Sequence, residues 1–145
     1  MSNKTLNCPI RGELKVKEKA KDDLTFTEEY RRIECVKELL NLGYPKERFD
    51  FEKIVWDNLG NSGRNNIRAD IVIYDDDKKE KIFLIAEIKR DDVNKKNETI
   101  ETQLKPPLIK NKATYGIYYD GVENVFLDVG GGLRTRISFC KISKV

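Results

Sequence analysis

Two apolar segments joined by a short charged turn constrain the fold of this chain more than any other feature. Ile67 to Tyr74 (IRADIVIY) and Lys81 to Lys89 (KIFLIAEIK) are rich in the β-branched and aromatic residues typical of strands, and Asp75 to Glu80 (DDDKKE) separates them. The second segment contains a nearly unbroken apolar run, which indicates a strand covered on both faces. The pattern predicts a β-hairpin at the centre of a sheet.

Three charged residues interrupt these apolar strands. Because side chains alternate between the two faces of a strand, Glu87 and Lys89 point the same way. If the hairpin is symmetric about its charged turn, Asp70 faces Ile85 and lies one diagonal step from Glu87, about 7–8 Å away. A slip of one residue would reverse the face, so the grouping of Asp70, Glu87 and Lys89 depends on this register.

The residue types missing from the chain narrow the chemistry. The sequence has no histidine, and its three cysteines, Cys8, Cys35 and Cys140, are widely spaced. Zinc ligation of the usual kind and histidine-based catalysis are therefore excluded. The net charge of +3 is compatible with nucleic acid but does not require it.

Two carboxylates on one face can hold one divalent cation, and oxygen ligands alone favour Mg²⁺ or Mn²⁺. We therefore expect Asp70 and Glu87 to bind the metal. Lys89 could orient a water molecule or stabilise charge that develops on a phosphate. Without a metal, the same three residues would be an ion-paired strand end.

The rest of the chain predicts one domain of the α/β (α+β) class, with a mixed sheet flanked by helices. The clearest helix spans residues 25–42, with Thr27 as its N-cap and Gly43 after its end. A second helix near residues 100–108 must end or kink at Pro106 and Pro107. Further strands are expected at residues 48–56, 114–119, 122–129 and 133–142. Residues 1–23 are interpreted as an N-terminal arm and residues 24–145 as the domain.

The order of the motifs resembles a known family. Asp70 with Glu87-Ile88-Lys89 is similar to the PD-(D/E)XK nuclease motif. The wider series is TEEYRRIECVKELLNLGYPKERFDFE, IRADIVIY, FLIAEIKR, Gln103 and ATYGIYYDG. It resembles the N-terminal nuclease domain of type I restriction enzyme R (HsdR-type) subunits over roughly residues 24–130. The resemblance implies a restriction-endonuclease-like sheet and a metal-dependent endonuclease that hydrolyses double-stranded DNA.

The resemblance also implies roles for further residues. It places a glutamate of the first helix near the metal, here Glu29 or Glu28, and helical spacing from Ile33 favours Glu29. It adds the Ile88 carbonyl as a metal ligand and Gln103 as a residue that approaches the site or the DNA. The tyrosine that often follows this glutamine by four positions is replaced by Pro107.

The implied partners are double-stranded DNA, a motor domain, and modification and specificity subunits. ATP would act only through the motor domain, which we do not find in these residues. No segment has the length and apolar character of a membrane span, and the cysteine usage suggests the cytoplasm. Two alternatives stay open: a catalytically silent nucleic-acid-binding or assembly module of the same fold, and a stand-alone nuclease such as a Holliday-junction resolvase.

Overall fold

The computed structural model describes residues 5–17, 27–56, 66–90, 95–122 and 124–129. Its elements are, in chain order, β1 (Thr5–Cys8), β2 (Gly12–Lys17), α1 (Glu28–Asn41), η1 (Lys46–Arg48), β3 (Phe49–Trp56), β4 (Ile67–Tyr74), β5 (Ile82–Ile88), α2 (Lys96–Thr99), the π-helical segment η2 (Ile100–Leu104), α3 (Lys105–Asn111), β6 (Tyr115–Tyr119) and β7 (Val125–Asp128). The strand predicted at residues 133–142 lies outside the described residues.

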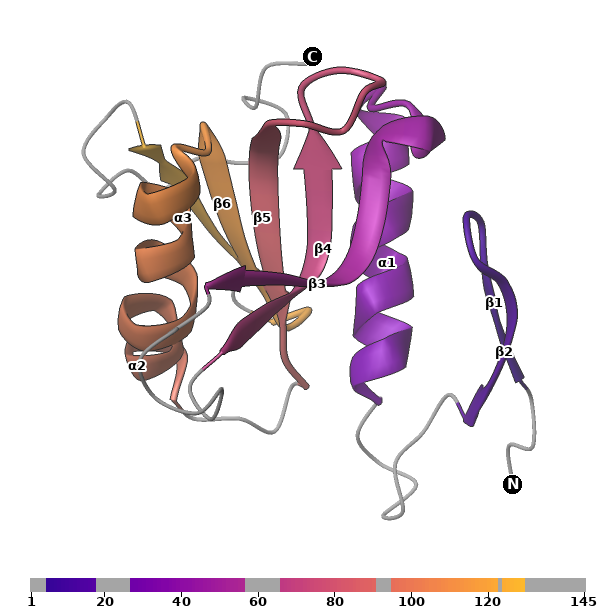
Figure 1. The fold of residues 1–145 in the computed structure, drawn as a ribbon. Coiled ribbons are helices and arrows are strands. Elements are labelled where there is room, and N and C mark those ends of the chain that lie inside the picture. Colours follow the sequence, from indigo (N-terminus) through magenta and orange to yellow (C-terminus); the bar gives the residue numbers. More distant parts are fainter. Residues whose placement is uncertain (1–4, 18–26, 57–65, 91–94, 123, 130–145) are drawn as a thin grey trace.

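A mixed five-stranded sheet forms the centre of the molecule. Its order is β3-β4-β5-β6-β7, and all neighbours are antiparallel except β5 and β6. Helix α1 lies along one face, and α2, η2 and α3 form a helical layer along the other (Figure 1). The predicted α+β class, with a mixed sheet flanked by helices, is confirmed. No helix in the described parts of the chain is long and apolar enough to cross a membrane.

Alternate residues of the central strands pack against opposite helical layers. Ile71 of β4 packs in a buried cluster with Leu39 of α1, whereas Val72 packs in a second cluster with Leu104 and Leu108 of the other layer. Strand β5 has a neighbour on each side and is buried on both faces, which explains its nearly unbroken apolar run.

Helix α1 begins and ends as its sequence predicts. The Thr27 side chain accepts a hydrogen bond from the Tyr30 N–H at 3.2 Å, which satisfies one of the free N–H groups of the first turn. Gly43 follows the helix with φ of +101°, a conformation that glycine adopts without steric cost. The cap therefore places Glu28 and Glu29 in the first turn of α1.

The two prolines of the second helical layer do not break a helix in its middle. They occupy the first turn of α3, directly after the Lys105 N–H, which donates to the Ile100 carbonyl of the preceding turn. The preceding turn is the π-helical segment η2, which carries Gln103. Pro106 and Pro107 thus mark the change from η2 to α3 rather than the end of the layer.

The predicted register of the β4–β5 hairpin is wrong by two residues. Ile85 faces Val72 rather than Asp70, because the turn is asymmetric, with a bulge beside Tyr74 and Lys79 at φ of +57°. A shift of two residues keeps every side chain on its predicted face. The pairing ends at Ile71, which faces Ala86, so Asp70 and Glu87 are the next residues beyond it.

The N-terminal segment contains a hairpin, β1–β2, that packs on the domain. Leu6 and Cys8 belong to the same buried cluster as α1. The guanidinium group of Arg11, in the turn, lies 4.5 Å from the centre of the Phe51 ring of β3. The hairpin thereby brings a positive charge to the helix end that carries Glu29.

Candidate active site

Asp70 lies where the pairing of β4 with β3 is interrupted and its pairing with β5 ends. The β3–β4 pairing includes Phe51 with Ile71 and Lys53 with Ala69 but omits Glu52 and Asp70. Glu52 has φ of +53°, which is unusual for a residue other than glycine. Strand β3 bends sharply along its length (Figure 1). The positive φ of Glu52 coincides with the gap in the pairing opposite Asp70.

The Asp70 carboxylate, rather than a backbone carbonyl of β4, accepts a hydrogen bond from β5. Its Oδ2 accepts a hydrogen bond from the Ile88 N–H at 2.7 Å, while the Lys89 N–H donates to the Tyr119 carbonyl of β6 at 2.9 Å. The N–H and C=O of one extended residue point toward the same neighbouring strand. The Ile88 carbonyl therefore lies on the Asp70 side of β5.

Glu87 and Lys89 form an ion pair at the end of β5. The Lys89 Nζ lies 3.3 Å from the Glu87 Oε2. Glu87 is 5% exposed, which is unusual for a glutamate. The structure therefore brings Asp70, Glu87 and Lys89 together at one end of the β4–β5 hairpin.

The two carboxylates share a poorly hydrated environment and repel each other. Burial raises the pKa of Asp70 to about 6, although the Ile88 N–H and the Arg32 guanidinium act in the opposite direction. Burial raises the pKa of Glu87 to about 8, the charge of Asp70 adds to this effect, and Lys89 opposes it. A cation placed between the two groups would relieve both penalties.

Glu28 and Glu29, in the first turn of α1, have different surroundings. The charge of Glu28 also raises the pKa of both Asp70 and Glu87, by less than burial does. The Glu29 carboxylate instead pairs with Arg11 of the hairpin and lies 3.9 Å from the Arg32 Nε. Helical spacing could not reveal the pairing of Glu29 with Arg11, because Arg11 arrives from the hairpin.

Arg32 links carboxylates from three elements. Its guanidinium donates to the Asp70 Oδ1 at 3.2 Å and lies 3.6 Å from a Glu52 carboxylate oxygen and 3.9 Å from one of Glu29. From the sequence no role was predicted for Arg32, and Glu52 and Arg11 were missed. No local pattern could have indicated these contacts, because they join the hairpin, α1, β3 and β4.

The charged side chains that interact around Asp70 and Glu87 include more carboxylates than cations. They are Glu28, Glu29, Glu52, Asp70 and Glu87, with Arg11, Arg32 and Lys89. Five carboxylates and three cationic groups carry two net negative charges when all are ionised. One divalent cation would neutralise this charge.

Substitution of Arg32 tests this network. We expect Arg32→Ala to lower the free energy of unfolding by about 3 kcal/mol, because it leaves the half-buried carboxylates of Asp70 and Glu29 without their cation. The Arg32 side chain is only 9% exposed. Urea denaturation would measure the loss.

A matched control is Arg48→Ala, which removes a pair with the 79% exposed Asp77. The expected cost of this change is about 1 kcal/mol or less. Equal losses from the two substitutions would contradict the assigned role of Arg32.

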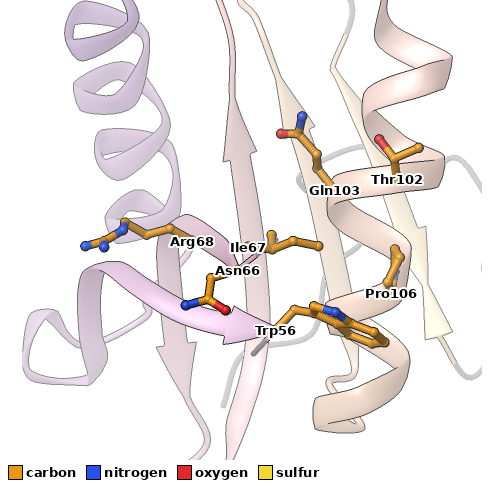
Figure 2. A pocket seen from close by; sticks show the side chains of 7 residues that line it. All are labelled: Trp56, Asn66, Ile67, Arg68, Thr102, Gln103 and Pro106. Atoms are coloured by element: carbon orange, nitrogen blue, oxygen red, sulfur yellow. The ribbon is translucent and has the colours of Figure 1, made fainter. Parts of the chain in front are cut away.

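Gln103 lies apart from the carboxylates. It is half-buried on η2, and no contact among the described residues joins it to Asp70 or Glu87. It lines a pocket of about 530 Å³ between the strand ends and the helical layer, shown in Figure 2. The lining residues are Trp56, Asn66, Ile67, Arg68, Thr102, Gln103 and Pro106.

The candidate metal ligands at this site are all oxygen atoms. Within the described ranges, no three or more His, Cys, Asp or Glu side chains are grouped as a metal site. The oxygen donors that do converge are the carboxylates of Asp70 and Glu87, with the Ile88 carbonyl on the Asp70 side. This set of hard oxygen donors fits Mg²⁺ or Mn²⁺ better than zinc.

Comparison with known proteins gives one match. Residues 27–138, well over half of the chain, match the family described as type I restriction enzyme R protein N terminus (HSDR_N). No curated protein and no solved structure matches the chain. The matched range contains α1, β3, β4 and β5, and therefore Glu28, Arg32, Asp70, Glu87 and Lys89. The chain belongs to the type I restriction enzyme R protein N-terminal family.

Proposed function

We propose that this domain is a metal-dependent endonuclease that hydrolyses phosphodiester bonds of double-stranded DNA. One observation carries the proposal: the half-buried carboxylate of Asp70 and the buried carboxylate of Glu87 act on each other beside the Lys89 ammonium, at the ends of two paired strands. Burying like charges is costly unless a ligand compensates for it. Membership of the restriction enzyme R family supports DNA as the substrate.

In this proposal Asp70, Glu87 and the Ile88 carbonyl hold Mg²⁺ or Mn²⁺. When bound, such a cation supplies Lewis acidity that polarises a phosphodiester oxygen and makes a water more acidic. The Ile88 N–H holds the Asp70 carboxylate in place through Oδ2, at 2.7 Å. Asp70 therefore meets the cation from a fixed orientation, which lowers the entropic cost of binding.

Lys89 and Glu28 complete the proposed site. The Lys89 ammonium lies 3.3 Å from Glu87, so it can orient a water or stabilise charge on the attacked phosphate. We assign the acidic position of the first helix to Glu28 rather than Glu29, because the Glu28 charge acts on both Asp70 and Glu87. Glu29 would hold the hairpin through Arg11.

The proposal extends to partners outside this chain. As part of a type I restriction enzyme R subunit, the domain would act with an ATP-driven motor and with modification and specificity subunits. ATP would then influence cleavage only through the motor, because the proposed site itself contains no nucleotide-binding loop of the GxxxxGK[ST] type.

A second candidate function is a catalytically silent nucleic-acid-binding or assembly module. One observation favours it: both oxygens of Asp70 are engaged, Oδ2 by the Ile88 N–H and Oδ1 by Arg32. A cation would then have to compete with Arg32 for Asp70. The two functions differ in whether DNA is cut.

The test is cleavage of supercoiled plasmid DNA by the 145-residue chain, alone and joined to its motor partner. We expect nicked or linear products with Mg²⁺ or Mn²⁺ and none with EDTA. DNA binding without cleavage under all these conditions would overturn the catalytic proposal and support the silent module.

A further inference from the structure

A pocket separate from the carboxylates has the chemistry of a base-binding site. It opens between the end of β3, the start of β4 and the helical layer that carries η2 and α3. Figure 2 shows Trp56 and Ile67 from the strands around the same space as Gln103 and Pro106 from the helices. The volume of about 530 Å³ lies within the range of small-molecule sites.

The lining favours an uncharged, flat ligand with a polar edge. Trp56, Ile67 and Pro106 are apolar, and the amides of Asn66 and Gln103 supply both donors and acceptors. The one charged lining residue, Arg68, extends away from the other side chains in Figure 2 and donates to the Glu52 carbonyl at 3.4 Å. The lining therefore suits a heteroaromatic ring better than a phosphate.

The Trp56 indole is held in place by the neighbouring helix. The Lys110 Nζ lies 5.1 Å from the centre of the ring, a cation–π contact. The Asn111 side-chain amide donates to the Val55 carbonyl at 2.8 Å and to the Pro107 carbonyl at 2.9 Å, which ties the end of β3 to α3. An aromatic ring fixed before binding loses little entropy when a ligand stacks on it.

The pocket is close to the proposed cleavage site along β4. Arg68, at its edge, precedes Asp70 by two residues, a spacing of about 7 Å, or roughly two nucleotide rises of B-DNA. We propose that the pocket binds one unpaired nucleobase of the DNA strand, stacked on Trp56 and contacted at its edge by Gln103 and Asn66. This inference rests on the proposed function only in taking DNA as the ligand.

Trp56 is the only tryptophan in the chain, so its fluorescence reports directly on the pocket. The Lys89→Ala chain in EDTA would be titrated with a single-stranded oligonucleotide, a fully paired duplex, and the same single strand with abasic central nucleotides. We expect strong quenching by the first and weak quenching by the other two, because only an accessible base can stack. Equal quenching by the intact and the abasic strand would overturn the proposal.

Variants separate the pocket from general electrostatic attraction. Gln103→Ala should weaken binding of the single strand about five-fold, and Trp56→Ala about ten-fold or more, both measured by anisotropy of a labelled strand. Asn97→Ala, an exposed amide outside the pocket lining, is the matched control and should leave affinity unchanged. Equal effects of Gln103→Ala and Asn97→Ala would contradict the assignment, even if Trp56→Ala fails to fold.

The pocket and the proposed function can fail separately. Cleavage by the unaltered chain without base-dependent quenching would overturn the pocket alone. Base-dependent quenching without cleavage would overturn the nuclease and support the pocket as part of a silent DNA-binding module.

Discussion

A chain carrying Lys89→Ala is expected to lose metal-dependent DNA cleavage by on the order of 10²–10³-fold while keeping its fold. The Lys89 ammonium lies 3.3 Å from Glu87 and is 22% exposed, so it can contact both the buried carboxylate and an arriving phosphate. Removing it takes away the charge available to orient water or to stabilise the phosphate. Initial rates of plasmid nicking with Mn²⁺ would measure the loss.

The matched control is Lys81→Ala. Lys81 precedes the opposite end of β5, where its Nζ donates to the Lys112 carbonyl at 3.4 Å on an exposed surface. This substitution removes the same charge from the chain and should leave the nicking rate unchanged. If Lys89→Ala nicks DNA as fast as Lys81→Ala, Lys89 takes no part in the reaction.

We expect the thermal stability of the chain to depend on pH and on bound metal. The pKa values of Asp70 and Glu87 in the folded chain, about 6 and about 8, exceed the ordinary carboxyl value, mainly through burial. Their contribution to stability is therefore full below the ordinary carboxyl pKa and is lost as the pH rises through these two values. In EDTA we expect Tm to fall by about 5 °C or more between pH 5 and pH 9.

Mn²⁺ should counteract this fall, because it binds the ionised carboxylates of the folded chain only. The gain in Tm from Mn²⁺ should therefore grow with pH. Glu87→Gln should flatten the pH dependence and reduce the gain, whereas Glu80→Gln, in the exposed turn, should do neither. A gain from Mn²⁺ that is the same in the Glu87→Gln chain would show that the metal binds elsewhere.

Local signals were sufficient for the elements that support the site. The Thr27 cap, the terminating Gly43 and the apolar run of β5 all have short-range causes, and each predicted an element that the structure contains. The closeness of Asp70 and Glu87 could also be predicted, because a register error of two residues leaves both at the same end of the hairpin.

Contacts between distant segments could not be predicted in the same way. Arg11 reaches Glu29 only because the β1–β2 hairpin packs against α1, and Arg32 reaches Asp70 across 38 residues of sequence. The positive φ of Glu52 could not be predicted, because β3 contains no glycine or proline. These interactions depend on tertiary packing, so no local pattern in the sequence could indicate them.

The bend at Glu52 affects whether another copy of the protein can pair along the edge of β3. Strand β3 is at one end of the sheet order, so one of its edges lacks a partner within that sheet. A straight unpaired edge of this kind invites pairing with another chain and aggregation. The positive φ of Glu52 interrupts the edge, and the exposed side chains of Glu52 and Lys53 place charge there. The backbone distortion opposite Asp70 therefore also interrupts the edge along which another chain would have to pair.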